Sequence, residues 1–423
     1  MVRFLKKMFI PAAAFFVALS LLFAGCGTKA DGGYSYFVQL DLDRSALFVD
    51  GENLSLSEYR ELMSELKTLV NGLEEDFSVE FPEGDIARIN AAEAGEIVQV
   101  SGDTYTALSL AFFYEEEENG CFSPTLFPLT ELWGFSPANE GSYGVSRGEP
   151  EEGKLAQAKS LCDPSFFVLG EDHTVVKSVA VAKLDFGGIA KGYMCDRISS
   201  YILQKYQGHT VDGMIGVMSN TVLLGKKIED GASRNFNVAI ENPRDLLSGG
   251  EKSSALFLVG LSDVSVTTSS DNYRFYVNDG KVYPHIIDAK TGKPADRGII
   301  SVTAVVPDSV PNAGAFADSL TTAVFCMPLT EAIGFLGEMS EKYGVGAVVI
   351  TSDHKYYAVG DVCVMDRGEY AAFSNEFLGT DYDLEDFPDE EEVFVAGDVA
   401  SASDTVVPCE KEKEYIAMIA ARS

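Results

Sequence analysis

Alternation of short apolar runs with helical segments is the feature that most constrains the fold of this chain. Each run is rich in Val, Ile, Leu or Phe and is bounded by Gly, Pro or polar residues, as β-strands are, whereas the segments between the runs have helical spacing. The predicted strands are Val222–Leu224, Phe236–Ile240, Leu256–Leu261, Ile300–Val306 and Ala347–Ile350, and the predicted helices are Ser55–Leu73, Asp103–Tyr114, Lys191–Lys205, Ala315–Cys326 and Thr330–Glu341. The pattern predicts the α+β class.

The first 25 residues have a basic start, an apolar run from Met8 to Phe23 and the small pair Ala24-Gly25, and Cys26 follows directly. This order predicts a secretory signal peptide rather than a part of the fold. It resembles the lipobox of bacterial lipoproteins, which implies a diacylated Cys26 and a lipid anchor at the extracytoplasmic face of the cell membrane. An uncleaved anchor and a soluble secreted form are the alternatives. Residues 26–34 are expected to form a short tether.

Acidic residues outnumber basic ones by 65 to 32, which gives a formal charge of −33. Nucleic-acid binding is therefore not expected, because phosphate contacts need clustered Lys and Arg. An anionic bilayer surface would also repel the chain, so a covalent lipid is the expected membrane attachment.

Six cysteines besides Cys26 are scattered, without a CxxC pair or a His-Cys cluster. A zinc site is not expected, and the spacing predicts no disulfide pairing. Cys195 and Cys326 are expected to be small buried residues.

The composition shifts after about residue 370. Residues 381–392 carry eight acidic groups and no basic one, which is typical of a solvated or disordered segment. We expect residues 371–423 to form an acidic tail that is dispensable for chemistry, and residues 35–370 to form the functional domain.

Three segments far apart in sequence carry residues suited to a polyphosphate and metal site. In Asp185–Tyr193 two glycines lead into a helix that contains Lys191. Close backbone approach, free helix N–H groups and a positive charge suit a phosphate, although an ordinary turn has the same pattern.

The second segment, Ala317–Ala323, places Asp318 and Thr322 on one helix face. Such oxygen ligands suit Mg²⁺, whereas helix capping by Asp318 is the simpler interpretation. The third segment, Tyr283–Pro294, contains a polar turn from Asp288 to Gly292 and His285, which can act as an acid or base or be a hydrogen-bonded core residue.

Together these segments resemble the ApbE family, the bacterial FAD:protein FMN transferases, over about residues 66–365. The resemblance rests on an ordered series: Arg88–Asn90, Asn119–Thr125, Leu132–Phe135, Asp185–Tyr193, Glu241–Pro243, Thr268–Asp271, His285–Pro294 and Ala317–Thr322. It implies a T-fold-like domain of mixed helices and antiparallel strands around a cleft for FAD and Mg²⁺. It also implies transfer of FMN from FAD to a threonine of a target protein, with release of AMP.

Site residues follow from the same resemblance. Asp318 and Thr322 match metal ligands, Gly188 matches a position that supplies a carbonyl oxygen, and Thr321 can also touch the metal. FAD-contacting positions are matched by Asp185, Lys191, Cys121, Phe122, Ser123 and Ile286. Lys191 would add positive charge at the phosphates, and His285 or Asp288 would orient the incoming threonine hydroxyl. The implied partners are flavoprotein subunits of membrane redox complexes or extracellular flavinylated proteins.

The chain departs from the family pattern around the flavin. The Met-Gly-Thr strand before the first helix is not recognisable. Glu80 stands where the family has an aromatic residue, and Met218-Ser219-Asn220 replaces a Gly-Gly-Asp sequence. Ser270 replaces a Gly, and Asn272 is an insertion before Tyr273. These changes leave open an alternative, an FAD-binding lipoprotein without transferase activity that slowly hydrolyses FAD to FMN and AMP.

Overall fold

The computed structural model describes residues 40–41, 47–136, 148–229, 231–244, 255–378 and 395–422. The predicted signal peptide, Cys26, the tether and the acidic run 381–392 lie outside these residues. No helix within the described ranges is long and apolar enough to cross a membrane.

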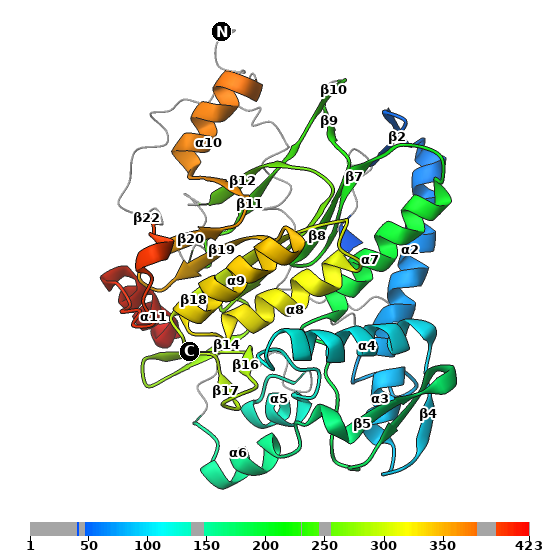
Figure 1. Ribbon diagram of the computed structural model, residues 1–423, viewed down its shortest axis with the longest axis vertical. Coiled ribbons are helices and arrows are strands. Elements are labelled where there is room, and N and C mark those ends of the chain that lie inside the picture. Colours follow the sequence, from blue (N-terminus) through cyan, green and yellow to red (C-terminus); the bar gives the residue numbers. More distant parts are fainter. Residues whose placement is uncertain are drawn as a thin grey trace.

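A mixed, largely antiparallel sheet forms the centre of the molecule (Figure 1). Its strand order is β22-β20-β19-β18-β13-β8-β7-β2-β3, with β1 paired to β7, and only β20 and β22 are parallel among its described pairs. The strands are β1 (Leu40–Asp41), β2 (Leu47–Val49), β3 (Glu52–Asn53), β7 (Val211–Val217), β8 (Asn220–Leu224), β13 (Val264–Ser270), β18 (Ile299–Pro307), β19 (Gly346–Thr351), β20 (Lys355–Val359) and β22 (Val395–Ala396).

Three helices cover one face of this sheet (Figure 1). They are α7 (Ala190–Lys205), α8 (Ala313–Phe325) and α9 (Leu329–Tyr343). A smaller sheet of β11 (Phe236–Ile240), β12 (Leu256–Leu261) and β21 (Cys363–Met365) packs on the other face through an apolar cluster that includes Leu223, Val266 and Leu258. Because both faces are covered, every residue of β18 except its last is buried.

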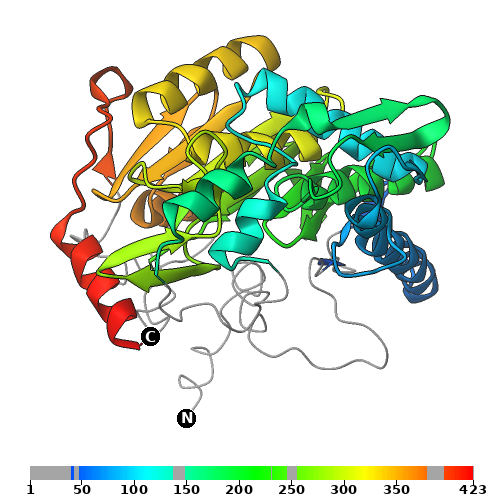
Figure 2. The same cartoon turned by 90° about the horizontal axis from the view of Figure 1, so that it is seen from below.

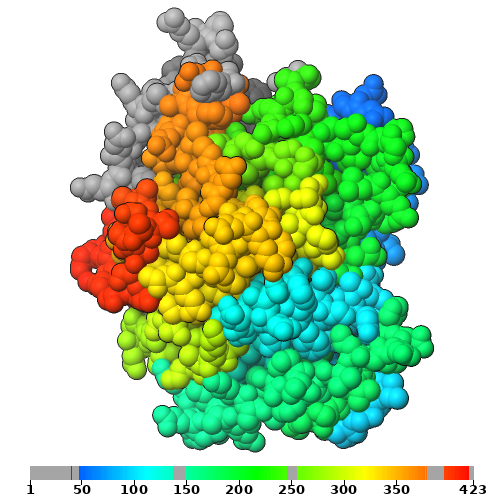
Figure 3. Space-filling view, viewed as in Figure 1, coloured from blue at the N-terminus to red at the C-terminus, as the bar shows by residue number. Residues whose placement is uncertain are grey.

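The lower half of the molecule in Figures 1 and 3 is built mainly from residues 85–177. It contains α3 (Asp85–Ala91), α4 (Gly102–Glu117), α5 (Phe127–Trp133), α6 (Glu152–Lys159) and a sheet of β4 (Ile97–Gln99), β6 (Thr174–Lys177) and β5 (Phe167–Gly170). Helix α2 (Leu56–Phe77) runs along the right-hand edge of Figure 1, beside α7. Helix α2 begins with a capping box between Ser55 and Glu58 and buries a stripe of Leu62, Leu66, Val70, Leu73 and Phe77.

The remaining elements are short. They are β9 (Lys227–Glu229), β10 (Ala232–Arg234), β14 (Phe275–Asn278), β15 (Lys281–Pro284), β16 (Ile287–Asp288), β17 (Lys293–Pro294), α10 (Arg367–Phe373) and α11 (Glu410–Arg422). Helix α11 lies beside the hairpin β14–β15, as Figure 2 shows from below.

The five predicted strands and five predicted helices are confirmed, with β11 and β12 matching to the residue. Residues 395–418 of the predicted tail are folded and not disordered, although most side chains of residues 395–410 are solvent-exposed or partly exposed. Within that range β22 pairs with β20, and α11 buries Glu412 and Tyr415 against the domain, because a buried arginine provides a counter-charge that the local composition does not reveal.

Helices α7 and α8 approach each other closely at two glycines. A Cβ atom on Gly192 would lie 2.0 Å from the Gly314 carbonyl oxygen, and one on Gly314 would lie 2.4 Å from the Gly192 carbonyl oxygen. Asp196 of α7 accepts hydrogen bonds from Gly314 N and Ala315 N at the start of α8, both at 2.8 Å. The two helices are therefore fixed in one register.

We expect Gly192→Ala to lower the free energy of unfolding by roughly 2–3 kcal/mol, because backbone atoms of α8 must move to make room. Gly334→Ala is the matched control, since an added Cβ there meets nothing within 4 Å in the helix α9. It should be neutral or stabilise by up to about 1 kcal/mol. Urea denaturation of both variants measures the difference, and equal stabilities would contradict the close-contact interpretation.

Candidate active site

A cavity of about 450 Å³ opens between the lower half of the molecule and the central sheet. Apolar and polar side chains from both halves share its wall. The lining includes Phe77, Phe122, Ser123, Phe135, Asp185, Gly188, Lys191, Met218, Ser219, Glu241, Ser270, Asn272, Tyr273, Arg274, His285, Ile286, Ser301 and Thr322. A concave site of this size with a few converging polar groups is suited to a cofactor-sized ligand.

Asp318 and Lys191 meet where α7 and α8 cross. Asp318 is buried, and its carboxylate lies 3.3 Å from Lys191 Nζ and accepts a hydrogen bond from Gly192 N at 3.0 Å. Helix α8 begins at Ala313, so Asp318 lies in its second turn and does not cap it. It instead accepts from a free N–H in the first turn of α7, which stabilises the charge at that helix end.

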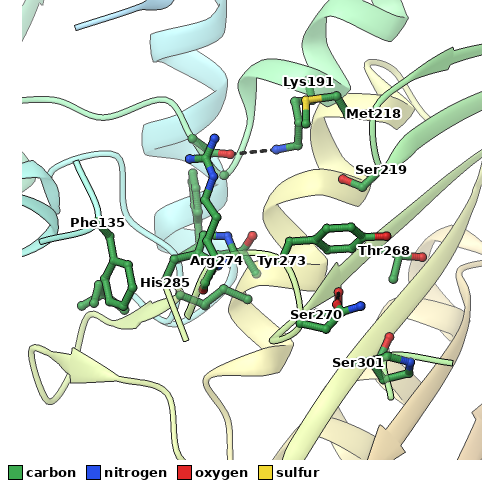
Figure 4. Close-up of a pocket in the computed structure, with 18 of the residues that line it drawn as sticks. Phe135, Lys191, Met218, Ser219, Thr268, Ser270, Tyr273, Arg274, His285 and Ser301 are labelled. Carbon is green, nitrogen blue, oxygen red and sulfur yellow. Dashed lines mark hydrogen bonds between the residues drawn. The ribbon is translucent and has the colours of Figure 1, made fainter. Parts of the chain in front are cut away.

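The turn before α7 is shaped by Asp185. One carboxylate oxygen accepts from Gly187 N at 2.8 Å and the other from the Thr130 hydroxyl at 3.3 Å. Burial raises the pKa of Asp185, and these two donors oppose that shift. Lys191 Nζ donates to the Gly187 carbonyl oxygen at 2.8 Å, so the turn holds the ammonium group at the cavity wall (Figure 4).

Oxygen donors gather beside Asp318. The Thr322 and Thr321 hydroxyls both donate to the Asp318 carbonyl oxygen, at 3.0 and 3.1 Å, and Thr321 also contacts the Ser269 hydroxyl of β13 at 2.9 Å. A Cβ on Gly188 would lie 3.4 Å from the Thr322 hydroxyl oxygen and 3.0 Å from the Phe122 ring. The four residues predicted as metal ligands are thus neighbours, with Thr321 turned toward β13.

His285 reaches the cavity from the segment between β15 and β16. Its backbone N–H donates to the Arg274 carbonyl oxygen at 2.9 Å, and its ring Nδ1 lies 3.1 Å from the same oxygen. Because a carbonyl only accepts, Nδ1 carries the proton and Nε2 is the unprotonated nitrogen. Burial, together with the charges of Arg274 and Lys191, lowers the pKa of His285 to about 3. The imidazole is therefore neutral at ordinary pH.

Four predicted residues do not line the cavity. Asp318 and Thr321 are buried next to Thr322, which does line it, and Asp288 and Cys121 have other surroundings. The buried Asp288 carboxylate accepts from Lys290 N at 2.8 Å and from Arg297 Nη2 at 3.1 Å, so it holds the polar turn after β16. Cys121 is buried behind its neighbours Phe122 and Ser123, and burial raises the pKa of its thiol. Phe122, Ser123 and Ile286 line the cavity, and their contact with FAD stays a prediction.

The departures from the family pattern lie at the cavity as well. Met218 and Ser219 form the β7–β8 turn, where Met218 has a φ of 51° and is 55% exposed. Figure 4 shows both residues above the ring of Tyr273. Glu80 does not line this cavity, whereas Phe77 and Val79 do. Phe77, the last residue of α2, therefore provides an aromatic side chain in this part of the wall.

Sequence reasoning missed Tyr273, Arg274 and Phe77. Tyr273 and Arg274 follow directly after Ser270–Asn272, where the chain departs from the family pattern. They lie between two recognised motifs, Thr268–Asp271 and His285–Pro294, and this position is the signal that could have identified them. Phe77 ends the apolar stripe of α2, and its spacing does not separate a core residue from one at the rim of a cavity.

The six cysteines in the described part of the chain are free. No group of three or more His, Cys, Asp or Glu side chains suited to a metal occurs among the described residues.

Comparisons with known proteins identify the family of the chain. An FAD:protein FMN transferase of Treponema pallidum is 30% identical over 315 residues, which cover 71% of this chain and 80% of that protein. An FAD:protein FMN transferase of Vibrio cholerae is 24% identical over 311 residues, or 74% and 86% of the two chains.

Solved structures show the same fold. The flavin transferase ApbE of Vibrio cholerae superposes with a TM-score of 0.59 at 24% identity, covering 73% of this chain and 91% of that one. The ApbE protein of Thermotoga maritima has a TM-score of 0.59 at 22% identity, covering 80% and 99%. The family model described as "ApbE family" matches residues 40–348. This chain therefore belongs to the ApbE family.

Proposed function

We propose that this protein transfers FMN from FAD to a threonine hydroxyl of another protein and releases AMP. The observation that carries the proposal is that Lys191, Gly188 and Thr322 line a cavity that also contains a neutral His285. The buried Asp318 carboxylate lies 3.3 Å from Lys191 Nζ. The relatives named FAD:protein FMN transferase support it.

The cavity offers FAD both charge and apolar surface. The pyrophosphate of FAD would lie against Lys191, Arg274 and the N-terminal turn of α7, where positive charge and helix N–H groups favour an anion. The aromatic rings of Phe77, Phe122 and Tyr273 provide flat surfaces for the ring systems of the dinucleotide.

The oxygen donors next to Asp318 fit Mg²⁺, which prefers carboxylate, hydroxyl and carbonyl ligands. Asp318, Thr322 and the Gly188 carbonyl would hold the ion, with Thr321 as a further donor. Bound there, Mg²⁺ would supply positive charge that offsets the phosphate charges during transfer.

Chemistry in this site needs positioning and charge neutralisation more than covalent participation by the protein. The threonine oxygen attacks the phosphorus of the FMN half, and the bond from that phosphorus to the bridging oxygen breaks. The bridging oxygen leaves with AMP. His285 Nε2 accepts the hydroxyl proton, because its lone pair is unprotonated at neutral pH. Asp288 has a supporting role here, since its carboxylate already holds the turn that follows His285.

A second candidate is FAD binding without transfer, with slow hydrolysis to FMN and AMP. Met218 favours it, since this side chain lines the cavity where the family has a glycine. Water in place of the threonine hydroxyl would attack the same phosphorus.

We further propose that the protein acts at the extracytoplasmic face of the cell membrane, attached through a lipid on Cys26. The basic start, the apolar run and the small residues before Cys26 support this location. It would hold the site near acceptor proteins in or on that membrane.

The transferase proposal predicts that the chain from residue 31, incubated with FAD, Mg²⁺ and a protein bearing an acceptor threonine, yields a covalently flavinylated, fluorescent band. Equal amounts of AMP should appear. AMP and free FMN without a band would favour hydrolysis, and FAD binding without a band or AMP would contradict both activities.

Asp318→Asn should reduce the transfer rate by about 100-fold or more at fixed Mg²⁺, because the remaining amide keeps the Gly192 hydrogen bond but lacks the charge that binds a cation. EDTA should abolish wild-type transfer. Glu338→Gln, an exposed change on α9, is the control. A rate within twofold of this control would contradict the metal assignment.

His285→Ala should lower kcat by about 10²- to 10⁴-fold, as expected for loss of a general base, with FAD affinity changed much less. Because the pKa of His285 is lowered to about 3, the wild-type base stays unprotonated as the pH falls from 8 to 5. The wild-type rate should therefore show no loss centred near pH 6.5. A titration at that pH which disappears in His285→Ala would contradict the buried, neutral imidazole.

A further inference from the structure

A buried charged cluster lies behind one wall of the cavity. The Arg244 guanidinium donates to both oxygens of Asp271, at 2.6 and 2.9 Å, and to both oxygens of Glu412, at 2.7 and 2.8 Å. The side chains of all three are less than 10% exposed. Because each carboxylate accepts two hydrogen bonds from the same guanidinium, the relative positions of the three side chains are fixed.

Two of these residues belong to segments that form the cavity wall. Arg244 ends the segment Glu241–Arg244, in which Glu241 and Pro243 line the cavity. Asp271 lies between Ser270 and Asn272, which line it as well. The Tyr273 hydroxyl donates to Glu241 at 2.6 Å. The two segments are therefore tied together at the cavity by Tyr273 and behind it by Arg244.

The third residue, Glu412, comes from α11. The Tyr415 ring of the same helix lies over the Arg244 guanidinium, 4.5 Å from its centre, and packs with Val277 of β14. Cys409 N donates to the Ser352 carbonyl oxygen just before α11 begins. Figures 2 and 3 show the end of the chain lying along the flank of the domain, next to the hairpin that follows Tyr273.

Glu412 and Tyr415 lie outside residues 40–348, which the family model matches. Without α11, the Arg244 guanidinium would keep Asp271 and the Pro243 carbonyl oxygen as partners but would lose Glu412 and the Tyr415 ring that covers it. Buried, shared hydrogen bonds of this kind restrict the geometry of the groups they join.

We propose that α11 is a brace that, through Glu412 and Arg244, positions the Glu241–Arg244 and Asp271–Arg274 wall and so sets the affinity of the cavity for FAD. This inference rests on the proposed function. Glu412 and Tyr415 are positioning residues, since neither lines the cavity. The C-terminal segment would then matter for FAD binding, although it does not line the cavity.

Glu412→Gln tests the brace in the full chain. It removes one charge but leaves Arg244 paired with Asp271, so folding should be retained. Glu410→Gln on the same helix is the matched control, because Glu410 is 84% exposed and pairs only with its neighbour Lys413 among the described ion pairs. FAD affinity is measured directly by quenching of flavin fluorescence, and KM and kcat for FAD are measured separately with an acceptor protein.

We expect Glu412→Gln to weaken FAD binding and raise KM about tenfold relative to Glu410→Gln, with kcat at saturating FAD changed less than about twofold. An affinity within twofold of the control, or a fall in kcat without a change in KM, would overturn the brace. Should Glu412→Gln not fold, Tyr415→Leu must show the rise in KM, and its absence overturns the proposal. Wild-type protein that binds FAD but transfers nothing would refute the proposed function and leave the binding comparison valid.

Discussion

The close contact between α7 and α8 is the constraint on which the site depends. Gly192 and Gly314 let the backbones meet, and a reciprocal pair of carboxylates then fixes the contact: Asp196 accepts from the start of α8, and Asp318 from the start of α7. Each helix thereby satisfies N–H groups of the other. The same contact brings Lys191 and Gly188 to Asp318, so the helix packing and the chemistry cannot be varied independently.

Charge is distributed unevenly between the site and the rest of the molecule. The chain as a whole carries −33, yet Lys191, Arg274 and the positive end of α7 converge on one cavity. Under the proposed function, these local contacts would favour the FAD pyrophosphate in spite of the acidic charge of the whole chain. Burial adds a second effect, since it keeps His285 neutral next to two cations.

Much of the fold and the centre of the site could be predicted from sequence. Periodicity identified α7, α8 and β18, and the Asp185–Tyr193 and Ala317–Thr322 motifs identified the residues that meet at the helix contact. Asp288 was predicted to face the substrate, but its carboxylate accepts a hydrogen bond from the backbone N–H of Lys290 in its own turn. The sequence does not distinguish such a turn residue from one that contacts a ligand. Glu412 was missed because its partner, Arg244, is 168 residues away, and an acidic surrounding sequence gives no sign of a buried pair.

The central claim is that one cavity holds FAD with its pyrophosphate at the α7–α8 contact. A crystal structure of the chain with FAD and Mg²⁺ tests it most directly. We expect density for the pyrophosphate between Lys191 and Arg274, with a cation next to Asp318 and Thr322. Density for FAD outside this cavity, or a pyrophosphate remote from Lys191 and Asp318, would contradict it.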